Sequence, residues 1–270
     1  MRRYSSDWYW YYAINYTLVI IIIFPIYWTL ISSFKKPSEL ITSEPTFYPH
    51  DLTLQYYDQI WNFDRLKRLQ DTESEDSESS GVEIESKFRL DGEGVKRPFM
   101  NSAIVSAGTI ILTIIVCTLG GYALTVLNTP LKNFFFLLVI LPILIPGISL
   151  IIPLYKLLKD LGLTNTHLGL ILIHTCGMLP LGIFMMRNAF NSIPSSLREV
   201  AMLEGSSELK IITSVMLPLA IPGLLTVMVF AMYVSWNDYI YAFIFINSPE
   251  NTMLNISSVS YTHLRAHETT

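Results

Sequence analysis

Long apolar runs alternate with polar stretches along this chain, and the runs have the length that a lipid bilayer requires. A hydrocarbon core about 30 Å thick needs roughly 20 apolar residues at a helical rise of 1.5 Å per residue. Five runs meet this requirement and predict five membrane-spanning helices. They cover Tyr11 to Ser33, Ser102 to Leu127, Phe134 to Leu158, Leu168 to Met186 and Leu217 to Phe245.

One long polar segment, residues 34–101, separates the first two runs. Its middle part, about residues 63–96, is acidic, rich in serine and glycine, and nearly free of large apolar side chains. Such a composition cannot bury enough apolar surface to offset the entropy lost on ordering. We therefore expect residues 34–101 to form an outer loop with a mobile acidic insertion. A ligand-binding role for the acidic residues is the alternative.

Composition supports a membrane protein and argues against a nucleic-acid surface. Of the 270 residues, 51% are hydrophobic, and the mean hydropathy is +0.42. The net charge of −4 reflects the acidic insertion more than the rest of the chain. Cys117 and Cys176 both lie inside apolar runs, where two small buried hydrophobes are expected rather than a disulfide or a metal site.

The cationic residues near the ends of the runs predict how the chain is oriented. The first run follows Arg2 and Arg3 but exceeds a signal-peptide core and lacks a small-residue cleavage site, so it reads as an uncleaved anchor. With residues 1–10 in the cytoplasm, six cations near the ends of the runs fall inside and two fall in the short outer loop, a modest bias in the direction that the positive-inside rule favours. Lys35 and Lys36 run against this assignment. The cations placed inside are Arg2, Arg3, Lys132, Arg187, Arg198 and Lys210, and those in the short outer loop are Lys156 and Lys159.

A polar stretch, residues 195–219, precedes the fifth run. Ser196 and Glu199 have the spacing of a capping box, which predicts a helix beginning there. Gly205 interrupts this helix, and a second helix over residues 207–216 can follow directly. The pattern predicts two short helices that meet at a glycine and lie across the cytoplasmic membrane surface. An interfacial helix packing on lipid headgroups is the alternative interpretation.

The same stretch resembles a known motif. Glu199-Val200-Ala201, Gly205 and Leu217-Pro218 match the EAA motif of permease subunits of binding-protein-dependent ABC importers. That motif reads E-A-A, three residues, G, nine residues, I-x-L-P, and the spacing agrees at each step. Val200, Glu204 and Val215 replace the usual Ala, Asp and Ile.

Further passages narrow the resemblance to carbohydrate permeases, specifically the second permease of the maltose-transporter type. They are SSFKKPSEL, NSAIVSAGTI, IPLYKLLKDLGLTNTHLGLIL, MRNAFNSIP and SWNDYIYAF. The resemblance implies an all-α membrane protein with the MetI-like helical bundle, its permease core at residues 102–258 and its EAA loop at 194–218. Members of this type have six spans, so five are present and a sixth is expected to be missing. Residues 259–270 resemble a non-native tail, and we expect the native gene to continue.

The resemblance also implies a function: half of the translocation pathway of an ATP-driven sugar importer in the bacterial inner membrane. The implied partners are a homologous second permease, a dimer of ABC ATPases, an extracytoplasmic sugar-binding protein and membrane lipid. The chain has no G-x-x-x-x-G-K-[ST] loop, so we expect no enzymatic activity and no bound cofactor, with ATP and Mg²⁺ on the ATPase. The residues expected to bind the ATPase subunit are Glu199, Val200, Ala201, Leu203, Glu204, Gly205, Leu217 and Pro218.

Polar residues and prolines inside the runs are candidates for the translocation path. Trp236, Asn237 and Asp238 come late in the fifth run, and a straight helix from Leu219 would place Asp238 near the outer interface. They either line the path or contact the binding protein, or they form an interfacial anchor. In the third run, Pro142, Pro146 and Pro153 predict kinks, either around a cavity or for packing alone.

His174, in the fourth run, is more typical of a hydrogen-bonded structural residue than of a proton relay. The alternatives for function are a permease for polyamines or amino acids and an ion-coupled secondary transporter. The second would require coupling carboxylates within the spans, where Asp238 stands nearly alone.

Overall fold

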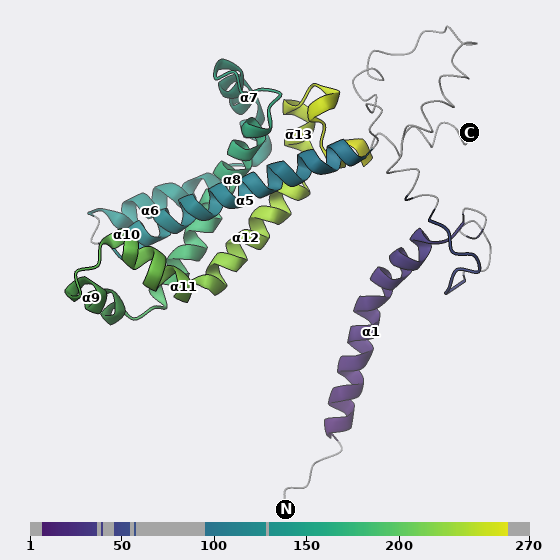
Figure 1. Ribbon diagram of the computed structural model, residues 1–270, viewed down its shortest axis with the longest axis horizontal. Helices are drawn as coiled ribbons and strands as arrows, with labels where there is room; N and C mark the ends of the chain where they lie inside the picture. The colour runs from purple at the N-terminus through teal and green to yellow at the C-terminus, as the bar shows by residue number, and fades with distance from the viewer. Residues whose placement is uncertain are drawn as a thin grey trace, which may run out of the picture. The chain divides into compact units, whose positions relative to one another are not determined.

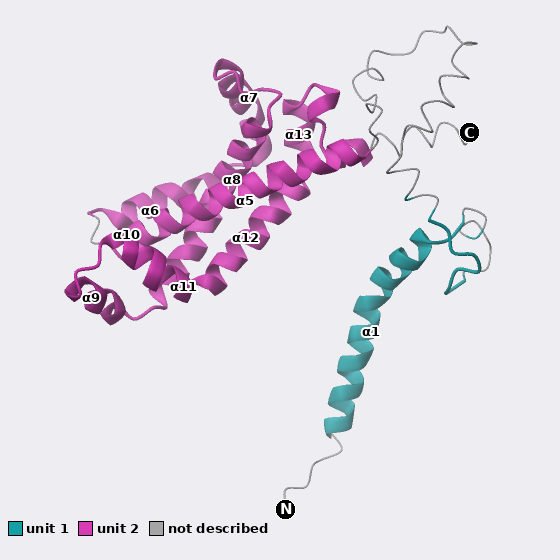
Figure 2. Cartoon of the chain, in the orientation of Figure 1, with its two compact units in different colours: residues 1–75 teal, residues 76–270 magenta. Residues whose placement is uncertain are grey.

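The computed structural model describes residues 7–36, 39, 46–54, 57, 95–127 and 130–258, and all regular structure in these ranges is helical. The chain divides into two units, Met1–Glu75 and Asp76–Thr270, which are considered separately (Figure 2). Nearly all of the expected acidic insertion, and the whole tail at 259–270, lie outside the described residues.

The first unit contains α1 (Asp7–Ser33), a helix that covers the first predicted span, starts four residues before it and is long and apolar enough to cross a membrane. The segment after α1 folds back on its end. Lys35 is buried, its ammonium donates to the Thr46 carbonyl, and it lies 4.8 Å from the centroid of the Trp28 ring. Lys36 forms an ion pair of 2.8 Å with Asp51. The two lysines that run against the predicted orientation are thus paired within their own unit.

The second unit is a bundle in which α5, α8 and α12 pack along one another (Figure 1). The helices α5 and α8 confirm the second and fourth predicted spans. The bounds in this unit are α5 (Lys96–Thr125), α6 (Lys132–Ile140), η3 (Leu141–Leu144), η4 (Gly147–Leu150), α7 (Ile151–Asp160), α8 (His167–Asn191), α9 (Ser195–Leu203), α10 (Glu208–Ile211), η5 (Ile212–Met216), α11 (Leu217–Leu219), α12 (Ile221–Trp236), α13 (Ile240–Phe245) and η6 (Pro249–Asn251).

Small residues allow the three long helices to approach closely, as is usual in membrane bundles. A Cβ atom added at Gly121 of α5 would lie 2.7 Å from the Cβ of Met186 on α8. One added at Gly182 of α8 would lie 2.4 Å from the Sγ of Cys117. Cys117 is fully buried, as expected, whereas Cys176 is exposed, which corrects the expectation for that residue.

The third run is not one kinked helix, and this corrects the sequence prediction. Its two halves, Lys132–Leu144 and Gly147–Asp160, meet at 97°. Ile145 at the break is extended, with ψ of 122°, the conformation that the ring of Pro146 favours for the residue before it. Pro146 therefore divides the run, whereas Pro142 lies within η3 and Pro153 within α7. The helices α6 and α7 lie at different ends of the bundle (Figure 1).

The fifth run is also divided, where one continuous helix was expected. Glu208–Leu219 and Ile221–Trp236 meet at 82°, with the corner at Ala220. Pro222 lies in the first turn of α12, where a missing backbone donor costs least. A second break after Trp236 separates α12 from α13. Asp238 therefore lies in this break and not on a straight helix counted from Leu219.

Candidate functional site

The helix α9 begins one residue before the predicted position and lacks the predicted capping box. Pro194 is its N-cap, no side chain caps it, and the Pro194 carbonyl accepts from the Leu197 amide at 3.2 Å. Ser196 consequently lies inside the first turn. A hydroxyl there is too far along the helix to serve as the N-cap acceptor, so Ser196 and Glu199 do not form the expected reciprocal pair.

The other end of α9 has the geometry predicted for Gly205. Its φ of +78° is left-handed, a conformation that glycine adopts without penalty. The Gly205 amide donates to the Met202 carbonyl and the Ser206 amide to the Ala201 carbonyl, each at 3.0 Å. These two bonds form a Schellman motif, so the direction in which the chain leaves α9 is fixed.

A second helical segment follows, as expected, from residue 208 to residue 219. Ser207 is its N-cap and accepts from the Lys210 amide at 3.4 Å. The segment passes through the π-helical turn η5 before α11 and the corner at Ala220. This segment and α12 meet end to end at 82°. When α12 spans the bilayer, the segment therefore runs along the membrane surface.

Most of the eight residues expected to bind an ATPase lie on the surface of this helix pair. Ala201 is buried and Leu217 is half-buried, while the other six are exposed. The exposed side chains include large apolar ones, with Leu203 of α9 at 89% exposure. We call this group the α9 apolar patch: Leu197, Val200, Met202, Leu203 and Leu209.

Three residues that sequence reasoning did not single out join this helix pair to the bundle. Tyr122 of α5 donates from its hydroxyl to a carboxylate oxygen of Glu208 at 2.6 Å. Arg198 of α9 forms an ion pair with the other oxygen of the same carboxylate. Glu208 lies outside the spanning helix α12, and the Tyr122 hydrogen bond and the Arg198 charge lower the pKa of its carboxyl. The sequence gives little signal for this contact, because Tyr122 and Glu208 are 86 residues apart.

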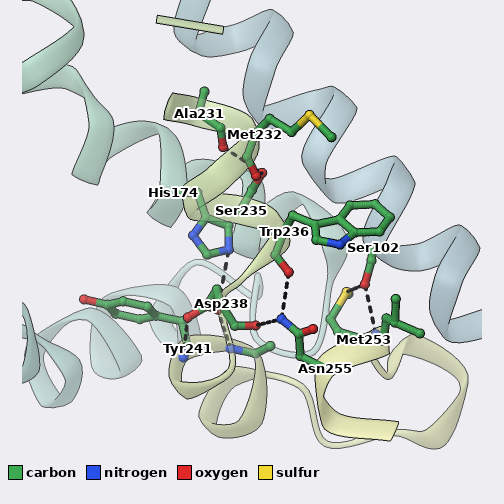
Figure 3. Close-up of polar contacts among 12 residues, drawn as sticks. Ser102, His174, Ala231, Met232, Ser235, Trp236, Asp238, Tyr241, Met253 and Asn255 are labelled. Carbon is green, nitrogen blue, oxygen red and sulfur yellow. Dashed lines mark hydrogen bonds and ion pairs between the residues drawn. The ribbon is translucent and has the colours of Figure 1, made fainter. Parts of the chain in front are cut away.

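At the opposite end of the bundle, Asp238 organises the break between α12 and α13 (Figure 3). Its carboxylate accepts from the Tyr241 amide at 3.2 Å and the Ala242 amide at 2.9 Å, and so caps α13. The Nε2 atom of His174 on α8 lies 3.6 Å from the same carboxylate, with both side chains buried. The structure thus places His174 beside Asp238, and the structural role favoured by the sequence stays a prediction.

The remaining path candidates differ in exposure. Asn237, Pro142 and Pro146 are exposed, whereas Trp236 is half-buried with its ring 5.6 Å from that of Phe99. The Asp238 carboxylate is bonded to the amides of α13, whereas the exposed Asn237 side chain donates to the Tyr233 carbonyl at 3.0 Å. Their place on a translocation path stays a prediction.

Asparagines fasten the segment that follows α13, and these residues were also missed from the sequence. Asn165, at φ +60°, accepts from the amides of Asn247 and Ser248, each at 3.0 Å. Asn101 of α5 donates to the carbonyls of Glu250 and Thr252. Asn255 donates to the carbonyls of Trp236 and Asp238 (Figure 3). Residues 246–258 are thus held against α5, α8 and the α12–α13 break.

Comparison of the sequence with known protein families identifies the family of this chain. Residues 116–262 match the family described as the binding-protein-dependent transport system inner membrane component. The chain belongs to this family. It is an ABC importer permease and a multi-pass membrane protein, and the resemblance drawn from the EAA motif is confirmed.

Individual relatives agree with the family. The chain is 31% identical to the inner membrane ABC transporter permease protein YcjP of Escherichia coli, over 88% of this chain and 75% of the relative. It is 28% identical to the sulfoquinovosyl glycerol transport system permease protein SmoH of Agrobacterium fabrum, covering 84% and 70% of the two chains. It is 31% identical to the melibiose/raffinose/stachyose import permease protein MelC of Bacillus subtilis, covering 60% and 59%.

A solved structure supports the fold of this permease. The crystal structure of a bacterial ABC transporter involved in the import of the acidic polysaccharide alginate matches with a TM-score of 0.71, covering 97% of this chain and 83% of that one. The sequence identity is 20%. The MetI-like helical bundle predicted from the sequence is confirmed by this match and by the family.

Proposed function

We propose that this permease is a subunit of an ATP-driven carbohydrate importer and that the α9 apolar patch docks on a cytoplasmic ATPase subunit. The observation that carries the proposal is the helix pair itself. A short helix ends in a Schellman turn at Gly205 and presents Val200 and Leu203, which are 53% and 89% exposed. Several large apolar side chains exposed on one short helix pair support this proposal, because exposed apolar surface commonly marks protein interaction sites.

The choice of carbohydrate rests on the relatives, because SmoH and MelC are named for the import of sugars or sugar derivatives. The partners proposed are an ATPase dimer, a homologous second permease and an extracytoplasmic binding protein. ATP hydrolysis takes place on the ATPase. Its closure displaces the helix pair, and the corner at Ala220 passes this displacement to α12. Rigid-body motions of this kind are common in transport and allostery.

The proposal includes the orientation of the chain in the membrane. With the N-terminus in the cytoplasm, the helix pair lies inside, and residues 246–258 lie outside at the other end of the bundle. Lys35 and Lys36, which run against this orientation, belong to the long segment 34–101, and long loops translocate largely regardless of their charge.

Photo-cross-linking tests the docking. A photoreactive amino acid at Leu203 is expected to capture a protein that contains a G-x-x-x-x-G-K-[ST] loop in membranes of the assembled transporter. A photoreactive residue at Leu144, which is 78% exposed and lies on η3, serves as the control. Capture of the ATPase from both positions, or from neither, contradicts the proposal.

Reconstituted uptake tests the solute class. In proteoliposomes with the ATPase, the second permease and the binding protein, radiolabelled maltose, melibiose or raffinose is expected to accumulate with ATP. Putrescine and glutamate serve as the comparison solutes. Accumulation of putrescine or glutamate without any sugar contradicts carbohydrate import and leaves the docking proposal to be judged by cross-linking.

A further inference from the structure

The contact between Tyr122, Arg198 and Glu208 joins the end of α5 to both short helices, α9 and α10. Tyr122 lies near the end of α5, Arg198 on α9 and Glu208 at the start of α10. Arg198 and Glu208 are ten residues apart and stand on opposite sides of the Gly205 turn. The ion pair therefore closes the turn, and the Tyr122 hydroxyl ties the closed pair to the membrane helix.

We call the contact of Tyr122, Arg198 and Glu208 the junction, and its tyrosine is buried. The Tyr122 side chain is 1% exposed, and its ring packs edge to face on Phe190 of α8 at 5.7 Å between centroids. The ring belongs to a core cluster that also contains Ala201 of α9 and Ile211 of α10. Both short helices thus insert an apolar side chain beside the tyrosine that binds Glu208.

Charge and hydrogen bonding favour one arrangement of the three groups. The Glu208 carboxylate accepts from the tyrosine hydroxyl on one oxygen and from the arginine on the other. Hydrogen bonds that involve an ionised partner are about twice as strong as neutral ones. The carboxylate therefore bridges the tyrosine and the arginine, and both bonds hold its orientation.

We propose that Tyr122, Arg198 and Glu208 are positioning residues that make the α9–α10 pair and the end of α5 move as one body, so that a displacement by the ATPase enters the bundle through α5 as well as through the corner at Ala220. This inference rests on the docking in the proposed function. Without the junction, α9 and α10 remain attached to the bundle by the Ala201 and Ile211 contacts and the chain, and part of the displacement is lost in bending.

Two single substitutions isolate the junction. Tyr122→Phe removes only the hydroxyl and keeps the ring on Phe190, and Glu208→Gln removes the charge with little change of shape. Tyr233→Phe is the matched control, because the side chain of Tyr233 on α12 is 65% exposed. The measurement is the amount of sugar transported per ATP hydrolysed in proteoliposomes, using the sugar that the wild-type transporter accumulates best.

Each junction variant is expected to lower the transport-to-hydrolysis ratio by about fivefold or more, the usual size of a coupling between two sites. Co-purification of the ATPase is expected to stay unchanged. The double variant Tyr122→Phe/Glu208→Gln is expected to match either single variant, because all three break one link. A wild-type ratio in both single variants, or reductions that multiply in the double variant, would overturn the proposal.

Spin labels on the chain alone separate this proposal from the docking proposal. On a background without Cys117 and Cys176, labels at Ser196 of α9 and Leu119 of α5, both exposed, are expected to give one narrow distance distribution in nanodiscs. Glu208→Gln is expected to broaden it. If the distribution stays narrow the junction proposal fails, whereas a broadened distribution without ATPase capture at Leu203 places the failure in the docking.

Discussion

Single backbone conformations decide how the two short helices are joined. Gly205 occupies a left-handed conformation, and its amide takes part in the Schellman motif that ends α9. An L-residue other than glycine or asparagine is disfavoured there by about 1 to 2 kcal/mol. The choice of residue at position 205 is therefore constrained by the backbone, although Gly205 is exposed and a Cβ there would meet nothing within 4 Å.

Gly205→Pro is expected to abolish ATP-driven uptake while leaving membrane insertion intact. Proline cannot adopt the positive φ and lacks the amide that donates to Met202. Gly205→Asn is the control, because asparagine tolerates the left-handed conformation and keeps the amide. The measurements are uptake in proteoliposomes and the yield of chain in the membrane, and wild-type uptake by Gly205→Pro would contradict the role of the turn.

Asp238 is expected to be more sensitive to alanine than to asparagine. Asp238→Ala removes the carboxylate that accepts from the Tyr241 and Ala242 amides, and a buried donor left without a partner costs about 1 to 3 kcal/mol. Asp238→Asn keeps an oxygen that can accept from the Ala242 amide. Thermal unfolding in detergent is expected to give a larger loss for alanine, and equal losses would show that the cap contributes nothing.

The stability contributed by Glu208 is expected to fall at acidic pH. The pKa of its carboxyl is lowered from the model-compound value of 4.5, so its contribution is present above that value and is lost as the pH falls through the lower folded pKa. The side chain is 43% exposed, so the effect is about 1 kcal/mol or less. Thermal unfolding between pH 3 and pH 7 is the measurement, and Glu208→Gln should flatten its dependence.

At the scale of elements, close approach of glycines to neighbouring helices holds the bundle together. The contact of Gly182 with Cys117 joins α8 to α5, and that of Gly121 with Met186 joins the same helices about one turn further along. Helices in a membrane gain little from the hydrophobic effect between them, so packing of this kind carries much of their association.

Gly182→Ala is expected to destabilise the bundle by about 1 to 3 kcal/mol because the added methyl group meets the Cys117 sulfur. Cys117→Ala removes this sulfur, so the double variant Cys117→Ala/Gly182→Ala is expected to recover most of the loss. Gly177→Ala is the control, because a Cβ there meets nothing within 4 Å. Thermal unfolding of the four proteins is the measurement, and a loss in Gly177→Ala equal to that in Gly182→Ala would contradict the packing argument.

At the scale of the whole molecule, the helix pair and the segment 246–258 lie at opposite ends of the second unit (Figure 1). This separation makes orientation testable. On a background without native cysteines, a cysteine at Ser196 is expected to react with an impermeant thiol reagent only in inverted vesicles. A cysteine at Glu250 is expected to react only in right-side-out vesicles, and the opposite result would reverse the proposed orientation.

Much of this molecule could be predicted from its sequence, because length and hydropathy report directly on spans. The span of α1, the bundle helices α5 and α8, and the glycine turn at 205 all follow from local patterns. Apolar runs do not report their own direction in space, so the 97° break at Ile145 and the 82° corner at Ala220 were not predicted. The prolines were visible, but whether a proline kinks or divides a helix depends on the packing of both halves.

The polar junctions were the hardest part to predict. Tyr122 and Glu208 are 86 residues apart, and Asn101 and Glu250 are 149 apart. Such pairs leave no periodic signal in one sequence. The expected capping box at Ser196 failed for a related reason: its spacing was correct, but Pro194 already occupied the cap.

Because Glu208–Leu219 meets α12 at 82°, a small rotation about Ala220 produces a larger displacement at the far end of this segment. The arm from Glu208 to Leu219 is about 18 Å long at 1.5 Å per residue, so turning it by about 10° about the corner would carry its far tip roughly 3 Å. A stroke of that size is about half of one helical turn and exceeds the shifts of about 1 to 2 Å that helices make at interfaces in many switching proteins.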